Sequence, residues 1–424
     1  MSRTMSRIAF VSPLPPAETG IATYAAAVLD GLDETGFTRR HEVDRVWPLH
    51  QNIEPRIAEA DLGIFQLGNN VEFHGDIYAL SVFHPGVVVL HDLALDGLMW
   101  GLGQTDSPLA VPARAEAIEA APRGANEDDP LSIPWAAQAV RRARAVIVHS
   151  VFARSYLEDV GCRTPIVVAP HPLVERDADV EAARPRAREL RAGVARSDEL
   201  LVGVAGDLNA SKGIEELLAS LSSVTADVRV ALVGRHSPHW DLDAVLRDSG
   251  AADRVTVVED VADEDFLAWL AAFDVLVNLR FPHRGETSGS LVRALHVGVP
   301  TIVSAVGTYL EVPDDLVERI PSGRPDAREL AAAIDRLAAE PERRAAMRER
   351  APRWARDALA PARAAAAYEE AVDTVLAYRA DPARVALSRW AEALRSVGVG
   401  PQHVRRGFGL RYAEALAAFR AASD

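Results

Sequence analysis

Short apolar runs rich in β-branched residues alternate with longer, alanine-rich amphipathic stretches along most of this chain. Strands of a parallel sheet are buried on both faces, so they are almost continuously hydrophobic, and a crossover, usually a helix, must separate each strand from the next. The alternation therefore predicts an α/β fold built on parallel sheets. The chain has 424 residues, which at roughly 150 residues per domain corresponds to two or three domains.

The apolar runs fall into two series, which predict two doubly wound, Rossmann-like domains facing each other across a cleft. The first series predicts strands at Arg7–Ser12, Leu62–Gly68, Gly86–His91, Ala145–Ser150 and Pro165–His171. The second series predicts strands at Leu200–Gly206, Val228–Gly234, Val255–Asp260, Asp274–Leu279 and Pro300–Ala305.

The segments outside these series lack the pattern of strands. Val174–Asp198 is polar and predicts a linker that carries a short polar helix. Gln104–Pro134, with several prolines and an acidic cluster, predicts a mobile loop that interrupts the first domain, a candidate lid on the acceptor side. Asp326–Ala380 has helical spacing broken by Pro341, Pro352 and Pro361, and Asp381–Asp424 predicts one or two further helices. We place the domains at residues 1–180, 181–362 and 363–424, and we expect a helix of the last segment to pack on the first domain.

Charge and cysteine content exclude several classes of protein. The 46 basic and 61 acidic residues give a net charge of −15, which disfavours nucleic acid as a partner and permits at most peripheral contact with an anionic membrane. The single cysteine, Cys162, excludes an internal disulfide and a thiolate metal site. The first apolar run, Ile8–Val11, is too short for a signal peptide. We expect a soluble, cytoplasmic protein.

Ligands of open parallel sheets bind beyond the carboxyl ends of the strands, so the loops there are the candidate sites. Gly20 is the first residue of a predicted helix. Either it lets main-chain N–H groups approach a phosphate closely, or it is a glycine that only turns the chain. His91, followed by Asp92, is either an ionisable site residue or a core histidine bonded to a carbonyl. Lys212 lies beside a predicted helix start, either as part of a phosphate cradle or as an exposed lysine.

The segment Leu279–Leu295, LRFPHRGETSGSLVRAL, carries the strongest signal. Arg280, Arg284 and Glu286 precede a predicted helix whose first turn is small and polar, and the N–H groups and positive dipole end of such a helix attract an anion. Thr287 or Ser288 as an N-cap explains part of the pattern. Capping does not explain the cluster of charges, so we interpret the segment as an anion-binding site.

Taken in order, the segments PLPPAETGIATY, HPGVVVLHD, VIVHSVFA, GDLNASKGI, FPHRGETSGSLVRAL and GVPTIVSAVGTYLEVPD resemble bacterial members of glycosyltransferase family 4. The resemblance covers about Arg7 to Val375 and implies the GT-B fold. It also implies an enzyme that moves a sugar from a nucleoside-diphosphate sugar, with UDP or GDP as the nucleotide, to an acceptor hydroxyl with retention of configuration. Neither a cofactor nor an essential metal is expected for such an enzyme.

The resemblance implies roles for individual residues. It places His91 near the transferred sugar, Glu286 at the sugar hydroxyls and Lys212 at the diphosphate, which makes these three the predicted catalytic residues. The predicted diphosphate-binding residues are Gly20, Lys212, Arg280, Arg284, Thr287, Ser288, Gly289, Ser290 and Leu291. The predicted nucleoside-binding residues are Asp260, Val261 and Arg293.

Two positions depart from the family pattern. Arg293 stands where the family has a glutamate that holds the ribose, and Asp207 replaces an arginine that many members have beside Lys212. Arg280, Arg284 or Arg235 is the candidate for the missing positive charge.

Other functions stay open on this sequence. A GT-B nucleotide-sugar epimerase and a catalytically silent, nucleotide-binding scaffold of a biosynthetic complex are the alternatives. Asp241-Leu242-Asp243 spells the metal-binding DxD of other glycosyltransferases, but it falls in a predicted helix, and we expect no metal site. No motif specifies the oligomeric state or whether the acceptor is a glycan, a lipid-linked sugar or a small molecule.

Overall fold

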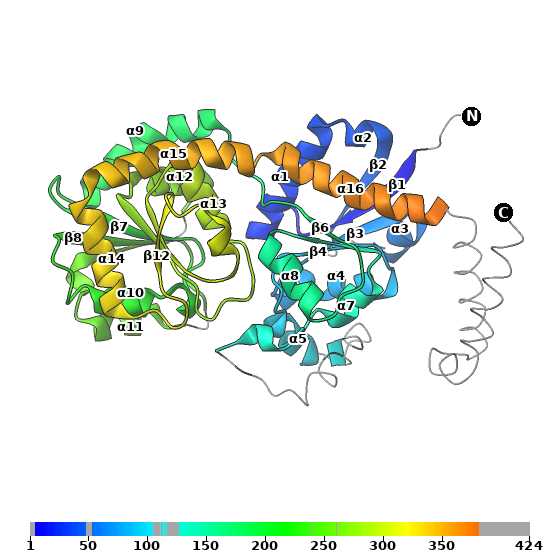
Figure 1. The fold of residues 1–424 in the computed structure, drawn as a ribbon, viewed down its shortest axis with the longest axis horizontal. Coiled ribbons are helices and arrows are strands. Elements are labelled where there is room, and N and C mark those ends of the chain that lie inside the picture. Colours follow the sequence, from blue (N-terminus) through cyan, green and yellow to red (C-terminus); the bar gives the residue numbers. More distant parts are fainter. Residues whose placement is uncertain are drawn as a thin grey trace, which may run out of the picture. The chain divides into compact units, whose positions relative to one another are not determined.

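The computed structural model describes residues 5–47, 53–104, 128–238, 240–259 and 261–380, together with residues 111, 113, 114, 116 and 126. The chain forms two compact units, Met1–Val372 and Asp373–Asp424. The first unit holds two parallel six-stranded sheets, each with helices on both faces (Figure 1). This confirms the predicted α/β class with two doubly wound sheets.

The first sheet has the strand order β2-β1-β3-β4-β5-β6. Its elements are β1 (Ser6–Val11), α1 (Gly20–Glu34), α2 (Phe37–Arg40), β2 (His41–Val46), α3 (Ile53–Glu59), β3 (Leu62–Leu67), α4 (Val71–Phe83), β4 (Val87–Leu90), α5 (Asp96–Gly103), the 3-10 helix η3 (Pro130–Ser132), α7 (Ala137–Arg142), β5 (Ala145–Val148), α8 (Val151–Asp159) and β6 (Ile166–Val168).

The second sheet has the strand order β12-β11-β10-β7-β8-β9. Its elements are α9 (Asp177–Val194), β7 (Leu200–Ala205), η4 (Ala210–Lys212), α10 (Ile214–Ser220), β8 (Val228–Val233), α11 (Leu242–Ser249), η5 (Ala252–Arg254), β9 (Val255–Val258), α12 (Asp263–Ala272), β10 (Val275–Asn278), α13 (Gly289–Val297), β11 (Thr301–Ser304), η6 (Gly307–Glu311), β12 (Val317–Ile320), α14 (Ala327–Ala339) and α15 (Pro341–Ala358). The helix α16 (Pro361–Ala380) follows.

Alternate residues of each strand enter different cores, as the pleat of a strand requires. In β7, Val202 and Val204 pack with side chains of α10 and α14 on one face of the second sheet. Leu201 and Ala205 of the same strand pack with α9 and α12 on the other face. The strands are therefore buried on both sides, which explains their continuous hydrophobic runs.

The sequence prediction missed two edge strands. The strand β2 (HEVDRV) pairs with β1, and β12 (VERI) pairs with β11, each through parallel hydrogen bonds. Charged residues interrupt the apolar run in both strands, and in β12 the buried Glu318 is paired with Arg336. Position at an edge does not by itself hide a strand, because β6 and β9 also lie at sheet edges and were predicted. The apolar-run criterion therefore misses strands that contain charged residues.

The segment between the sheets also differs from the prediction. We expected a linker with a short helix at Val174–Asp198, whereas α9 is an 18-residue helix that includes Pro185. Its Val180, Ala183 and Ala187 are buried in the same core as α12, so α9 is a layer of the second half of the molecule. Pro352 likewise lies inside α15 and does not break it.

The first turns of α16 pack against the first sheet, far from α16 in sequence. The Tyr368 ring stacks on Phe10 of β1 with ring centroids 6.3 Å apart, and its hydroxyl lies 3.0 Å from that of Tyr24 in α1. A Cβ atom on Gly31 would lie 3.0 Å from the main-chain oxygen of Pro361, so glycine permits the close approach of α1 and α16.

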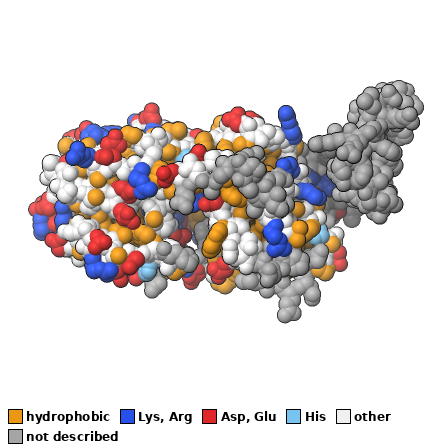
Figure 2. Space-filling model, turned by 90° about the horizontal axis from the view of Figure 1, so that it is seen from below, with side chains coloured by type: hydrophobic (Ala, Val, Ile, Leu, Met, Phe, Trp, Pro, Cys, Tyr) orange, Lys and Arg blue, Asp and Glu red, His pale blue; other side chains and the backbone are white. Residues whose placement is uncertain are grey.

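Several sequence predictions lie wholly or partly outside the described residues. These are the helices predicted at Asp381–Asp424 and most of the predicted loop Gln104–Pro134. Within the described part of the chain, no helix is both long and apolar enough to cross a membrane. Basic and acidic side chains are interspersed over the left half of the face in Figure 2. Arginines of the described residues form ion pairs with acidic side chains, such as Arg186 with Asp265 at 3.1 Å.

Candidate functional site

Two loops of the second sheet meet at the carboxyl end of β7. The ammonium group of Lys212 donates a hydrogen bond of 2.6 Å to the main-chain oxygen of Ala205, and the Ser290 hydroxyl donates one of 3.1 Å to the same oxygen. Gly206, with a φ of 95°, leaves room for both groups: a Cβ there would lie 2.6 Å from Ser290 Oγ and 3.0 Å from Lys212 Nζ. The fold thus brings the predicted lysine and the start of α13 together.

Lys212 is the one lysine in the chain, and every other of the 46 basic residues is an arginine. Its side chain is buried, and burial followed by the nearby charge of Arg280 lowers the pKa of its amine to about 7. A lysine is a compact charge whose pKa shifts readily on burial, whereas an arginine stays charged. The amine therefore gains a proton near neutral pH when a negative group arrives.

The N-terminus of α13 is capped by Ser288, whose hydroxyl accepts a hydrogen bond of 3.2 Å from Leu291 N. The predicted anion-binding N–H of Leu291 is therefore already engaged. The Thr287 hydroxyl is buried and has no hydrogen-bond partner among the residues that the structure describes. A buried polar group without a partner is costly, so Thr287 is a candidate to bind an incoming ligand. Gly289, whose Cβ position would lie 3.7 Å from His171 Nε2, completes this turn.

The charged residues before α13 are paired with one another and with the loop after β4. Arg280 and Glu286 form a largely buried ion pair at 2.9 Å, and Arg284 N donates to the Glu286 carboxylate at 2.7 Å. The Arg284 guanidinium donates two hydrogen bonds, of 2.8 and 2.9 Å, to the carboxylate of Asp96. The main-chain oxygen of Arg284 also accepts from Leu93 N at 2.8 Å.

His91 and Asp92 lie at the carboxyl end of β4. Both ring nitrogens of His91 have protein partners: Nε2 lies 2.9 Å from the side-chain amide of Gln66, and Nδ1 lies 3.2 Å from His149 Nε2. The Asp92 carboxylate accepts a hydrogen bond of 2.9 Å from Asn69 N. Burial, and then the negative charge of Glu286, raise the pKa of Asp92 to about 7, so its proton is available near neutral pH.

Gly20 is the first residue of α1, whose N-cap Thr19 accepts a hydrogen bond of 3.0 Å from Ala22 N. Apart from its chain neighbours and its own helix backbone, no heavy atom of a described residue lies within 4 Å of the Cβ position of Gly20. Beside this turn, Arg235, a candidate for the extra positive charge, donates to the carboxylate and main-chain oxygen of Glu18, each at 2.7 Å.

Two of the three predicted nucleoside-binding residues, Arg293 and Val261, lie in the described part of the chain. Arg293 forms an ion pair of 2.5 Å with Glu175, and its guanidinium lies 4.4 Å from the ring centre of Phe266. Val261 packs on the apolar core beneath α12, and Asp260 lies outside the described residues. A positive charge at position 293 is thus neutralised within the protein.

The sequence prediction named Asp92 only as the neighbour of His91, and it did not assign Gln66, His149 or His171 to the site. Three histidines follow the neighbouring strands β4, β5 and β6, and the ring centres of His91 and His149 lie 4.8 Å apart. A histidine at each of three strand ends is a signal in the sequence, but it becomes a cluster only when the strand order is known.

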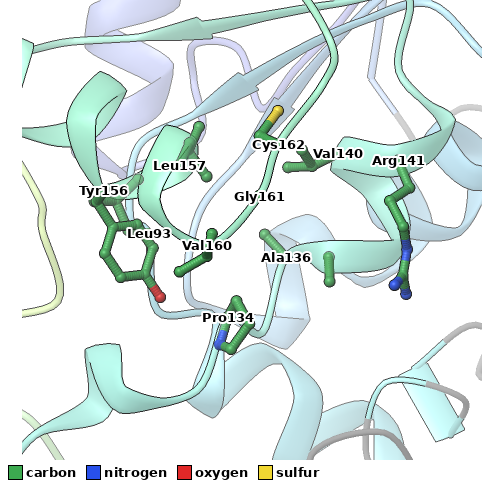
Figure 3. A pocket seen from close by; sticks show the side chains of 11 residues that line it. Leu93, Pro134, Ala136, Val140, Arg141, Tyr156, Leu157, Val160, Gly161 and Cys162 are labelled. Carbon is green, nitrogen blue, oxygen red and sulfur yellow. The ribbon is translucent and has the colours of Figure 1, made fainter.

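A pocket lies between α7 and α8, beside the loop after β4 (Figure 3). Val140, Leu157 and Val160 line it together with Leu93, the residue after Asp92. The Tyr156 hydroxyl at its rim donates a hydrogen bond of 2.8 Å to Leu131 O. Among the described residues, no three His, Cys, Asp or Glu side chains are grouped in a way that would hold a metal ion.

The family model that matches this chain covers the segment that holds Lys212 and α13, and similar solved structures cover most of the chain. Residues 199–340 match the family model of glycosyl transferases group 1. Sucrose-phosphate synthase from Thermosynechococcus elongatus has a similar structure, with a TM-score of 0.61 and 18% identity over 88% of this chain and 99% of that one. The fold is GT-B. No curated protein sequence matches the chain.

Two further GT-B structures extend the similarity. Anabaena HepE in complex with UDP-glucose has a TM-score of 0.58 and 17% identity over 88% of this chain and all of that one. WaaG, a glycosyltransferase involved in lipopolysaccharide biosynthesis, has a TM-score of 0.55 and 16% identity over 85% of this chain and 98% of that one. At sequence identities this low, the structural similarity shows the fold alone, and function has to be argued from the site.

Proposed function

We propose that this protein is a retaining glycosyltransferase that moves a sugar from a nucleoside-diphosphate sugar, with UDP or GDP as the nucleotide, to an acceptor hydroxyl. The observation that carries the proposal is the convergence of Lys212 Nζ and Ser290 Oγ on the Ala205 oxygen at the start of α13. The family match over residues 199–340 and the similarity to a structure with bound UDP-glucose support a nucleotide sugar as the ligand.

The chemistry of the donor explains these groups. When a nucleoside diphosphate leaves the sugar, negative charge develops on its phosphate oxygens. A preorganised cation and a helix N-terminus stabilise such charge most strongly where water is excluded. Lys212 supplies the cation, α13 supplies the dipole, and the partnerless Thr287 hydroxyl supplies a further donor. In this proposal these groups take the place of an essential metal.

Glu286 is an orienting residue in this proposal. Arg280 and the main chain of Arg284 hold its carboxylate as a fixed hydrogen-bond acceptor, which suits sugar hydroxyls. No side-chain nucleophile is assigned. His91 and Asp92, in the loop that is bonded to Arg284, lie where the transferred sugar and the acceptor hydroxyl would meet, and the first half of the chain would bind the acceptor.

The proposal is tested by calorimetric titration of the full chain with UDP, GDP, ADP and dTDP, with and without magnesium. We expect one nucleotide to bind without magnesium and Lys212→Met to lose at least tenfold in affinity. Arg188→Met, on the exposed face of α9, removes the same charge at a distance and serves as the matched control.

Binding of no nucleotide, or equal binding by the wild type and Lys212→Met, would overturn the proposal. Tight binding without hydrolysis or transfer of any matching nucleotide sugar would point instead to the silent scaffold. Conversion of the donor into an isomeric nucleotide sugar would indicate an epimerase.

A further inference from the structure

Five polar side chains form one continuous chain of hydrogen bonds behind the loop that carries His91. We call it the histidine chain; its members, in order, are Tyr24, Tyr368, Gln66, His91 and His149. The two tyrosine hydroxyls lie 3.0 Å apart. The side-chain nitrogen of Gln66 lies 2.9 Å from Tyr368 Oη, and its side-chain oxygen lies 2.9 Å from His91 Nε2. His149 Nε2 lies 3.2 Å from His91 Nδ1.

The protons of the histidine chain can be counted from its far end. His149 Nδ1 lies 3.0 Å from the main-chain oxygen of Ala169, which only accepts, so Nδ1 carries a proton. A neutral His149 then has a bare Nε2, because a neutral imidazole carries one N–H. His91 Nδ1 must donate to that nitrogen, and a neutral His91 is left with a bare Nε2 that needs a donor.

Among the described residues, the Gln66 side-chain amide is the group placed to donate to His91 Nε2. With the amide oxygen towards His91, as it lies in the structure, both ring nitrogens of His91 would have to carry protons, or those of His149 would. One of the two rings would then be a cation. If the amide NH2 faces His91, both rings are neutral and each contact joins one donor to one acceptor. The two ends of an amide have nearly the same shape, so the hydrogen-bond network decides its orientation.

The surroundings of the histidine chain favour neutral rings. Burial lowers the pKa of His149 to about 3, and burial followed by the presence of His149 holds the pKa of His91 well below its usual value. The other titratable side chains around the pair are His74 from α4 and His171 from beyond β6, and burial lowers the pKa of each to about 4. Asp92, the residue after His91, carries an acidic side chain whose pKa is itself raised to about 7.

We propose that Gln66 is a positioning residue, which turns its amide NH2 to His91 Nε2 and thereby fixes His91 as the neutral, Nδ1-protonated tautomer. The Gln66 oxygen then accepts from the Tyr368 hydroxyl, and Tyr24 donates to Tyr368. Since both nitrogens of His91 are engaged within the protein, its ring presents only its carbon edge to a ligand. His91 is thus not an acid or a base, and it acts on the sugar through its shape and main chain.

Nitrogen-15 spectra of histidine side chains in the wild-type full chain test the tautomer directly. A bare ring nitrogen resonates far downfield of a protonated one, so each ring reports its own state. We expect His91 and His149 each to show one protonated Nδ1 and one bare Nε2, unchanged between pH 5.5 and pH 8. Spectra of His91→Asn and His149→Asn assign the signals. A protonated His91 Nε2 in the wild type would overturn the inference, whether or not the protein transfers sugar.

A substitution that keeps the size of the side chain tests the role of Gln66. The carboxylate of Gln66→Glu only accepts, so we expect His91 to bind a second proton and both of its nitrogens to be protonated at pH 7. Gln66→Met fills the same space with no polar end. His149 still accepts from His91 Nδ1 in this variant, so we expect the bare Nε2 of His91 to lose its donor and its resonance to move further downfield. His74→Gln is the control, because His74 bonds the main-chain oxygen of Gln66 and not its side chain.

The effect on transfer depends on the proposed function. We expect Gln66→Glu to lower kcat at least tenfold, while the affinity for the nucleotide, which Lys212 and α13 bind, changes less than threefold. Unchanged His91 spectra in Gln66→Glu and Gln66→Met would refute the positioning role. If the wild type has the expected tautomers but no donor is turned over, the proposed function fails and the assignment of the histidine chain stands.

Discussion

The pKa of Lys212 makes nucleotide binding strongly dependent on pH. In the free protein the amine has a pKa of about 7. A bound diphosphate places negative charge against it and favours the protonated form. Above pH 7 each binding event must therefore take up a proton, and the apparent affinity falls about tenfold per pH unit.

The expected change follows from this linkage. Between pH 7 and pH 9 the Kd for the preferred nucleotide should rise about 50-fold, roughly 2 kcal/mol of binding free energy. Ionisation of the phosphate does not interfere, because its last proton, with a pKa of about 6, has already left. Ionisation of the uracil or guanine ring N–H at the alkaline end affects the Lys212→Arg variant equally, so that variant corrects for it. The fraction of a proton taken up should be about one half at pH 7 and should approach one at pH 9.

Calorimetry in buffers with different ionisation enthalpies measures the Kd and the proton uptake together. Because the chain has one lysine, labelling with ¹³C-lysine gives one side-chain signal, whose shift with pH reports the pKa directly. Lys212→Arg keeps a charge at every pH and should show a nearly constant Kd. A lysine signal that titrates near pH 10 in the free protein, or a Kd that rises less than threefold, would refute the reasoning.

Three further predictions concern stability and geometry. Gly206→Ala should weaken nucleotide binding and unfold at lower urea than Gly161→Ala, because both sites have a positive φ but only the Gly206 Cβ would meet Ser290 and Lys212. The free energy of unfolding of Asp92→Asn, measured in urea, should rise relative to that of the wild type between pH 4 and pH 7. The reason is that a carboxyl whose pKa is raised by folding destabilises the native wild type once it ionises. Equal differences in unfolding free energy at the two pH values would contradict this. Glu311→Ala should lose about 1 kcal/mol of unfolding free energy, because the carboxylate caps Val151 N and Phe152 N of α8, whereas Glu311→Gln should lose less.

Much of the fold follows from local pattern, because buried parallel strands are apolar on both faces. The ten apolar runs that predict strands all form them, including the edge strands β6 and β9. HEVDRV and VERI do not stand out because charged residues interrupt them. The length of α9 was underestimated because a polar helix that buries only a narrow stripe resembles a linker in composition.

The candidate site was predictable where its residues are close in sequence. Arg280, Glu286 and the cap of α13 fall within one loop and one helix start. Contacts between distant segments were not predictable, since they depend on which strands are neighbours. The ion pair of Arg293 with Glu175 and the approach of His149 to His91 are of this kind.

The packing of α16 on the first sheet affects the order in which the protein folds during synthesis. Tyr368 completes the hydrogen bonds of Tyr24 and Gln66, and the first turn of α16 approaches Gly31. During synthesis, the face of the first sheet that carries Phe10 therefore stays uncovered until the ribosome has made the whole of the second sheet. Synthesis proceeds at about 5–20 residues per second, so some 18 to 70 seconds separate the first strand from its covering helix. A fragment that ends before α9 lacks α16 and would expose the same surface permanently.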